Sequence, residues 1–257
     1  VFNPREYNWN SLEIQRVEDI RSMGFKIEAK PVVYFDPDLS PPFLKTLNST
    51  GLENETLAFV QQLLRKIPDA DIYSVSNEAN EERWRGGFTI DQYVQLLKKA
   101  TSMIRSIQRN ATLTVNSAGL FGGEERNAPD MNAFDWCQLL ISKGVDFDAI
   151  AIQFRPGYTE SWPSGIRRAR AVPSLTEISR KFDHYSTLGK RIHVEEFALP
   201  SRQMPNVDRY NNLDWNDALQ AAYAEGFYTI AFSKPATDLV TWWFIITAMP
   251  VPDEDIS

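Results

Sequence analysis

The chain has 257 residues, 43% of them hydrophobic and 12% aromatic, which is enough for one substantial core. Its 27 basic and 34 acidic side chains give a net charge of −7, which argues against nucleic acid and anionic membranes as partners. The single cysteine excludes an intrachain disulfide, and no stretch approaches the roughly 20 apolar residues of a membrane span. Oligomeric state stays open at this level.

Apolar, β-branched runs alternate along the chain with longer segments of helical period. The pattern predicts strands at residues 26–34, 72–76, 112–116, 149–154, 192–197 and 239–244. It predicts helices at residues 12–23, 53–66, 90–108, 133–143, 173–188 and 215–233, with stops at Gly24, Gly144 and Gly189. Such alternation is typical of parallel strands joined by helical crossovers. We therefore expect one α/β domain over residues 1–257.

The number of predicted strands falls short of a closed barrel. Six strands are two fewer than a (β/α)8 barrel contains, and residues 245–257 do not have the pattern of a helix. Three explanations are open at this point. The sequence is a piece of a longer chain, the barrel is open, or the missing strands come from another copy.

Two predicted strands end on glutamates, at Asn77-Glu78 and at Glu195-Glu196. Hydrolysis of a glycosidic bond uses two carboxyl groups on either side of one sugar, and the strand ends of a (β/α)8 barrel surround one mouth. Only one of Glu195 and Glu196 can face that mouth, because strand side chains alternate between faces. Each pair also has a structural alternative. Asn77 would cap a helix that begins at Glu78, and Glu195-Glu196 would form salt bridges at a strand end.

Short segments around these glutamates follow one another in a recognisable order. They are Asn8-Trp9-Asn10, Gly24 to Tyr34, Ser76-Asn77-Glu78-Ala79, Val115-Asn116, Ile150-Ala151-Ile152-Gln153, Val194-Glu195-Glu196-Phe197 and Val240-Thr241-Trp242-Trp243. In this order the chain resembles the family-10 glycoside hydrolases, which are retaining (β/α)8 xylanases, from about Asn3 to Phe244.

The resemblance implies a (β/α)8 TIM barrel that lacks its first two strands and its last helix in this chain, since the first two would lie before Val1. It implies that Glu78 is the acid/base and that Glu196, rather than Glu195, is the nucleophile. The residues expected to contact substrate are Asn77, Lys30, Asn116, Gln153, Arg155 and Trp242.

The chain departs from the family pattern beside both glutamates. The family's third strand carries histidines that line the cleavage subsite, and this chain has Lys30 and Phe35 there. The family nucleophile is held by a histidine that an aspartate supports, and those positions are Arg155 and Ala198 here. An arginine can hold Glu196 through two parallel hydrogen bonds, so the substitution either preserves catalysis or abolishes it.

Seven tryptophans and two histidines complete the set of candidate functional side chains. The indole rings expected at strand ends or on the loops after them, where they can stack on sugars, are Trp84, Trp162, Trp242 and Trp243. Trp136, Trp215 and Cys137 fall within helix patterns and are expected in the core. We expect no catalytic metal, because His184 and His193 belong to no Cys/His cluster, and no cofactor, because no phosphate-binding loop follows a strand.

The leading hypothesis is a secreted or extracellular retaining glycoside hydrolase, similar to endo-β-1,4-xylanases. Its expected substrate is a β-1,4-linked plant polysaccharide, with xylan first. The runner-up is an impaired barrel that binds polysaccharide without turnover, because Lys30, Phe35, Arg155 and Ala198 replace family residues. A third hypothesis keeps catalysis and changes the substrate, with Lys30 meeting a carboxylated branch such as a glucuronyl group.

Overall fold

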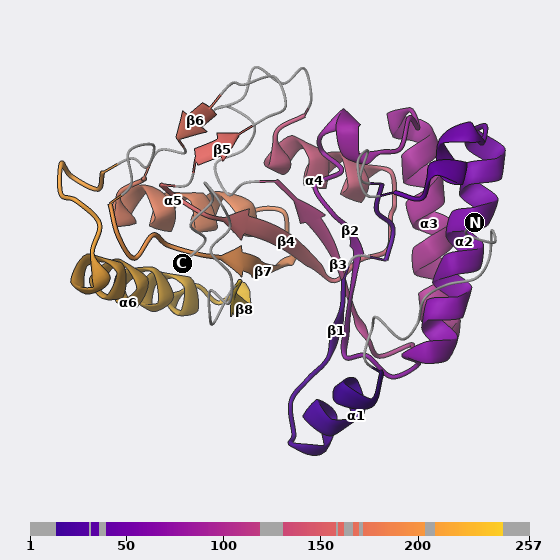
Figure 1. Cartoon of the computed structure of the whole chain (residues 1–257), viewed down its shortest axis with the longest axis horizontal. Helices are drawn as coiled ribbons and strands as arrows, with labels where there is room; N and C mark the ends of the chain where they lie inside the picture. Colours follow the sequence, from indigo (N-terminus) through magenta and orange to yellow (C-terminus); the bar gives the residue numbers. More distant parts are fainter. Residues whose placement is uncertain are drawn as a thin grey trace. The chain divides into compact units, whose positions relative to one another are not determined.

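The computed structural model describes residues 14–30, 32–35, 40–118, 131–157, 159–161, 167–169, 172–203 and 209–243. Six strands form one sheet in the order β1-β2-β3-β4-β7-β8, so the main strands follow their order in the chain (Figure 1). The neighbours β1 and β2, β2 and β3, and β7 and β8 pair in parallel. None of the helices in these ranges is both long and apolar enough to cross a membrane.

Helices and strands alternate as the sequence predicts. The sheet strands are β1 (Glu28–Ala29), β2 (Ile72–Ser76), β3 (Thr112–Ser117), β4 (Ala149–Phe154), β7 (Arg191–Phe197) and β8 (Thr237–Trp242). The α-helices are α1 (Ile14–Ser22), α2 (Ser49–Lys66), α3 (Ile90–Ile107), α4 (Ala133–Ser142), α5 (Leu175–Ser186) and α6 (Asp217–Ser233), and two 3₁₀ turns are η2 (Pro42–Thr46) and η3 (Glu82–Trp84). Phe244, the predicted end of the last strand, lies outside the described residues.

The chain divides into two compact units. The first contains residues 1–118, 129–131 and 135–150, and the second contains residues 119–128, 132–134 and 151–257. In the first unit, α2 and α3 lie side by side and α3 packs on β2 (Figure 1). In the second unit, α5 packs on β7 and on α6, which in turn packs on β8.

Helix boundaries follow from local capping chemistry. Thr89 begins α3 with a capping box, in which its hydroxyl accepts from the Gln92 N–H at 3.3 Å and the Gln92 side chain accepts from the Thr89 N–H at 3.0 Å. The predicted stops at Gly24, Gly144 and Gly189 are confirmed by left-handed backbone angles, with φ of 87°, 69° and 68°. These angles favour glycine because it has no Cβ to clash.

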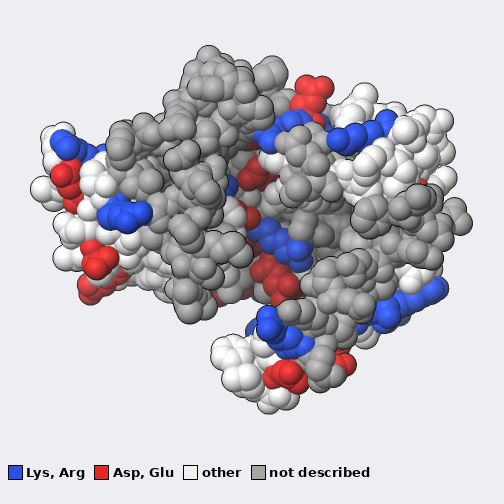
Figure 2. Space-filling view, in the orientation of Figure 1, with Lys and Arg blue, Asp and Glu red and all other residues white. Residues whose placement is uncertain are grey.

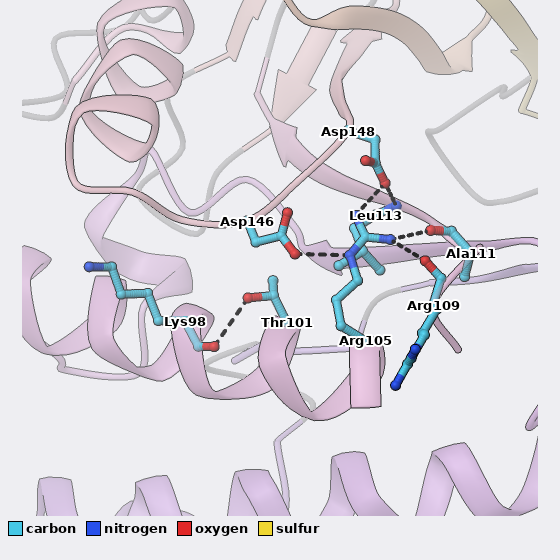
Figure 3. Close-up of polar contacts among 8 residues, drawn as sticks. All are labelled: Lys98, Thr101, Arg105, Arg109, Ala111, Leu113, Asp146 and Asp148. Atoms are coloured by element: carbon cyan, nitrogen blue, oxygen red, sulfur yellow. Dashed lines mark hydrogen bonds and ion pairs between the residues drawn. The ribbon is translucent and has the colours of Figure 1, made fainter. Parts of the chain in front are cut away.

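Arg105, in the last turn of α3, ties this helix to the strands beneath it (Figure 3). Its Nε donates to Asp146 Oδ2 at 2.9 Å, its Nη2 to Asp148 Oδ2 at 2.7 Å, and its Nη1 to the Ala111 carbonyl at 2.6 Å. Asp148 also accepts from the Leu113 N–H at 2.8 Å. One guanidinium group therefore fixes the end of α3 to the start of β3 and to the turn before β4.

Aromatic rings fill the interior of the second unit. Phe197 of β7 stacks on Phe227 of α6 with ring centroids 4.1 Å apart, and Phe154 of β4 stacks on the same ring at 5.0 Å. Helices α5 and α6 approach closely at Gly226, where a Cβ would lie 2.5 Å from Leu175 Cδ1. This packing fixes which faces of β4 and β7 point toward the helices.

Two features differ from the sequence prediction. The strand expected at residues 26–34 is regular only at Glu28–Ala29, although Val32 and Val33 still donate backbone hydrogen bonds to β2 at 2.9 and 2.7 Å. A small antiparallel hairpin, β5 (Thr159–Ser161) and β6 (Arg167–Ala169), was not anticipated, because three-residue strands are too short to give a period.

Candidate active site

Glu78 follows β2 in an uncommon backbone conformation. Its φ is +49°, in the left-handed region that costs a non-glycine residue about 1 kcal/mol or more. The Glu78 N–H donates to Asn116 Oδ1, on β3, at 3.3 Å, and the Glu78 carbonyl accepts from the Glu81 N–H at 2.9 Å. The residue is 7% exposed. Strained backbone that the surroundings hold in place is common at functional sites, and here Asn116 supplies one of the restraints.

Two further side chains hold the same loop. Asn80 is fully buried, with its Oδ1 accepting from the Ala118 N–H at 2.9 Å and its Nδ2 donating to the Met131 carbonyl at 3.3 Å. Arg85 is also buried and donates from Nη1 to the Ala79 carbonyl at 3.0 Å. Sequence reasoning missed both residues. The available signal was a second asparagine two positions after Glu78, in a loop that follows a strand.

The helix-cap alternative for Asn77 is wrong. No helix begins at Glu78, since the next helical turn is η3, which starts at Glu82 and is preceded by Glu81 as its cap. Asn77 is half-buried at the carboxyl end of β2. The local pattern was ambiguous because an asparagine before an acidic residue suits both a helix start and a polar strand end.

Glu196 lies near the carboxyl end of β7. Phe197 contacts α6, whereas the neighbouring Glu196 contacts Gln153 of β4, and the register of β7 with β8 is irregular between Val194 and Phe197. In β4, Phe154 contacts α6 as well. Gln153 Nε2 donates to Glu196 Oε1 at 3.1 Å. Gln153 is 1% exposed and Glu196 is 8% exposed, so this hydrogen bond is shielded from water.

Arg155 adds a positive charge to this pair. Its Nη2 donates to Gln153 Oε1 at 2.8 Å and lies 3.8 Å from Glu196 Oε2. The Arg155 guanidinium carbon lies 4.1 Å from the centre of the Trp243 ring, which is cation–π geometry. Three of the expected site residues, Gln153, Arg155 and Glu196, are therefore in contact within the second unit.

Glu195, the residue before Glu196 in β7, is also buried. Its charge raises the pKa of His193, although burial lowers that pKa more. The contacts with Gln153 and Arg155 are made by Glu196.

The remaining expected contact residues lie at strand ends. Lys30 directly follows β1 and is half-buried. Trp242 is the last residue of β8, partly exposed, with its ring edge-on to Phe197 at 5.1 Å. Asn116, in the fully buried part of β3, uses its side-chain oxygen to hold Glu78.

Phe35 belongs to the core of the first unit. It is buried against Phe88 at 5.6 Å and Tyr93 at 6.5 Å, and a Cβ on Gly86 would lie 2.6 Å from its ring. The resemblance had implied a subsite position for Phe35, so this implication is wrong. The aromatic ring packs inward because apolar neighbours from the following loop and helix surround it.

The other candidate tryptophans lie in different surroundings. Trp84, in η3, stacks on Tyr34 at 5.5 Å and lies 4.0 Å from the Arg83 guanidinium. Trp136 and Trp215 are buried, which confirms the core assignment, although Trp215 precedes α6 instead of lying inside it. Cys137 is likewise buried, and burial raises the pKa of its thiol to about 12. Trp162 lies outside the described residues.

The fold resembles solved xylanases, whereas no protein-family model and no curated protein matches the sequence. A Thermobacillus composti GH10 xylanase superposes with a TM-score of 0.67 and 16% identity, covering 94% of this chain and 71% of the xylanase. Xylanase 10B from Thermotoga maritima gives a TM-score of 0.66 and 17% identity, covering 94% and 69%. Xylanase 10B from Thermotoga petrophila, solved with xylobiose, gives a TM-score of 0.66 and 16% identity, covering 94% of this chain and 68% of the xylanase.

These similarities define the class of fold. The chain has a GH10-like fold, a partial (β/α)8 barrel whose six main strands alternate with helices. The expectation of this fold class is confirmed. At identities of 16–17%, the likeness concerns the fold.

Proposed function

We propose that this protein is a retaining glycoside hydrolase that cleaves a β-1,4-linked plant polysaccharide, with xylan as the first substrate to test. The observation that carries the proposal is a buried glutamate, Glu196, held by Gln153 and Arg155 at a strand end of a GH10-like fold. Support also comes from Glu78, which follows the carboxyl end of β2. In (β/α)8 barrels, residues that perform chemistry come from this end of the strands.

The two glutamates have different roles in the proposed reaction. Glu196 attacks the anomeric carbon while Glu78 protonates the departing glycosidic oxygen, which gives a covalent glycosyl-enzyme. Glu78 then takes a proton from water, which attacks the anomeric carbon and releases Glu196. Retention requires the carboxyl groups to be about 5–5.5 Å apart when the sugar is bound, because no water molecule stands between them.

Substrate contacts are proposed for polar and aromatic residues at strand ends. Asn77 and Lys30 supply donors to sugar hydroxyls, and Trp242 supplies an apolar ring face. Asn116 acts on substrate in part through Glu78, since its side-chain oxygen already accepts from the Glu78 backbone. These roles follow from position at strand ends and from the chemistry of each side chain.

The test uses isosteric variants and an aryl β-xyloside. Glu196→Gln and Glu78→Gln should each lower kcat/KM by at least about 10³-fold, because each removes a group that reacts. Glu195→Gln is the matched control, since Glu195 is the adjacent buried glutamate, and it should keep the parent rate. Full activity in Glu196→Gln, or loss of activity in Glu195→Gln alone, would contradict the assignment of the nucleophile.

Binding without turnover is the alternative that a specific observation favours. Arg155 places a cation beside Glu196, where the resembled family has a histidine. Ala198 stands where that family has the aspartate that supports the histidine. Incubation with insoluble β-glycans, with assays of both reducing ends and retention on the solid, separates the two functions. Retention without new reducing ends would support the binding protein, and released reducing sugar would exclude it.

Substrate choice is tested separately from catalysis. Lys30 is proposed to favour a carboxylated branch, because an ammonium group pairs with a carboxylate. Rates on glucuronyl-decorated and bare xylan should differ in the parent protein and converge in Lys30→Met. Equal rates in the parent would remove this part of the proposal.

The proposed location and partners of the protein follow from its proposed substrate and its charge. A plant polysaccharide is a polymer outside the cell, so we propose a secreted or extracellular protein. On the face in Figure 2, basic and acidic side chains of the described residues are interspersed. Together with the net charge of −7, this supports a glycan over a nucleic acid or an anionic membrane as the partner.

A further inference from the structure

We propose that Arg155 is a positioning residue that fixes the Gln153 amide toward Glu196 and is itself held on the ring of Trp243. The inference rests on the proposed function for its catalytic consequence, whereas the positioning can be measured without catalysis. It assigns to three side chains of the second unit the task that a histidine performs in the resembled family.

The first step concerns the orientation of the Gln153 amide. A glutamine amide has one accepting oxygen and one donating nitrogen, and it can rotate to exchange them. An arginine side chain only donates, so the group that meets Arg155 Nη2 at 2.8 Å must be Gln153 Oε1. The amide nitrogen then points to Glu196 Oε1, at 3.1 Å, where a carboxylate oxygen requires a donor. Arg155 thereby selects one of the two amide orientations.

The second step concerns the position of Arg155. Its guanidinium lies 4.1 Å from the ring centre of Trp243, so the planar cation rests on the aromatic ring. The Trp243 N–H donates to the Phe197 carbonyl at 2.9 Å. This is a backbone hydrogen bond, and Phe197 directly follows Glu196, so the backbone of Trp243 is tied to the same strand as the carboxylate.

The third step concerns the carboxylate itself. Glu196 is 8% exposed and has Gln153 Nε2 near one oxygen and Arg155 Nη2, at 3.8 Å, near the other. Buried carboxylates need donors for their oxygens, and two donors on different oxygens restrict rotation of the group. A nucleophile held in one rotamer reacts from the ground state without further ordering.

The experiment compares Arg155→Met, Arg155→Lys and Trp243→Phe with the control Arg191→Met. Arg191 makes an Arg–Asp pair with Asp238, at 2.8 Å, at the opposite end of the same strand. Two readouts are used: the side-chain ¹H–¹⁵N signals of Gln153, assigned by their loss in Gln153→Ala, and kcat and KM on an aryl β-xyloside. The NMR readout requires no turnover.

Arg155→Met should shift the two Gln153 amide signals and bring them closer together, because the amide becomes free to rotate. It should lower kcat roughly 10- to 100-fold with little change in KM, the range found when an outer partner of a functional group is removed. Arg155→Lys should recover part of both effects, since a lysine donates without stacking as a plane. Trp243→Phe should give a smaller change in the same direction, and Arg191→Met should change neither readout.

The two proposals fail in different ways. If the parent protein hydrolyses no β-glycoside, the proposed function falls, and the Gln153 signals still decide the role of Arg155. If those signals are unchanged in Arg155→Met, the positioning role is overturned whatever the activity. A rise in KM at constant kcat would also overturn it, because that result describes a substrate contact.

Discussion

His193 is a buried titratable group in β7, 3% exposed, with its Nε2 2.7 Å from Asp238 Oδ1. Burial lowers the pKa of His193 by disfavouring the charged imidazolium, and the charge of Arg191 lowers it further. The charges of Asp238 and Glu195 raise it, and the net direction is downward. The folded protein therefore prefers the neutral ring more strongly than the unfolded chain does.

This preference predicts a loss of stability in mild acid. As pH falls below about 6.5, the unfolded chain takes up the proton before the folded protein does, so the free energy of unfolding decreases. Above that pH, the neutral His193 ring makes its full contribution to stability. This contribution is lost as pH falls toward the lowered pKa of His193 in the folded protein. Each tenfold difference in proton affinity between the folded and unfolded states corresponds to about 1.4 kcal/mol. His193→Gln should therefore show a smaller fall in stability between pH 7.5 and pH 5 in urea titrations.

A second variant fixes the sign of this effect. Asp238→Asn removes a charge that raises the pKa of His193, so stability should fall more steeply with acidification than in the parent. Equal pH slopes in the parent and in His193→Gln would show that His193 does not carry the effect.

At the scale of elements, a few side chains fasten helices and loops to the sheet. Arg105 joins the end of α3 to β3 and to the turn before β4, and Asn80 joins the loop after β2 to residues at the end of β3 and before α4. Both make several hydrogen bonds to groups that need partners. Each therefore couples elements that are distant in the sequence.

Arg105→Met should lower the free energy of unfolding by about 2 kcal/mol, because it leaves the Asp148 carboxylate and the Ala111 carbonyl without this donor. The contribution of Asp146 should be small, since that side chain is 58% exposed. Arg109→Met is the control, because Arg109 is exposed and offers only its carbonyl to Arg105. Equal stabilities of the two variants, measured by urea unfolding, would show that the Arg105 hydrogen bonds contribute nothing net.

At the scale of the whole molecule, the division of the chain into two compact units falls within one strand. The first unit ends at Ile150 and the second resumes at Ala151, both in β4, which is buried along its whole length. Exposing part of a buried apolar strand to water is costly, so a strand of this kind unfolds as a whole.

We therefore predict one cooperative unfolding transition, as the sequence-based expectation of a single domain requires. Far-ultraviolet circular dichroism and tryptophan fluorescence should give superimposable urea curves with one midpoint. Each unit contains tryptophan, with Trp136 in the first and Trp215 in the second, so fluorescence reports on both. Two separated transitions would identify the units as independent domains.

The sequence predicted the elements well because their signals are local. The strands at residues 72–76 and 149–154 match β2 and β4 in both bounds, and α3 begins at the predicted Ile90. Alternation, helical period and capping depend on neighbours within a few residues, which the sequence displays directly. The predicted strand at residues 26–34 was too long: several of its residues have high β propensity, but the regular strand covers only Glu28–Ala29.

The candidate site was predicted in part. The resemblance chose Glu196 over Glu195, and both this choice and the joint action of Glu78 and Glu196 on one sugar stay predictions. Asn80 and Arg85 were missed because their partners are backbone groups of other segments. No local pattern marks a side chain that will bond to a distant carbonyl.

The sequence by itself determined the order of strands and helices and the presence of acidic residues at strand ends. Only the tertiary structure decided that Phe35 is a core residue, that Glu78 has a left-handed backbone, and that Gln153 links Arg155 to Glu196. The physical reason is the distance along the chain between the residues that determine each feature. Periodicity and caps are set by neighbours in the chain, whereas Gln153 and Glu196 are 43 residues apart and meet only when β4 and β7 join the same sheet.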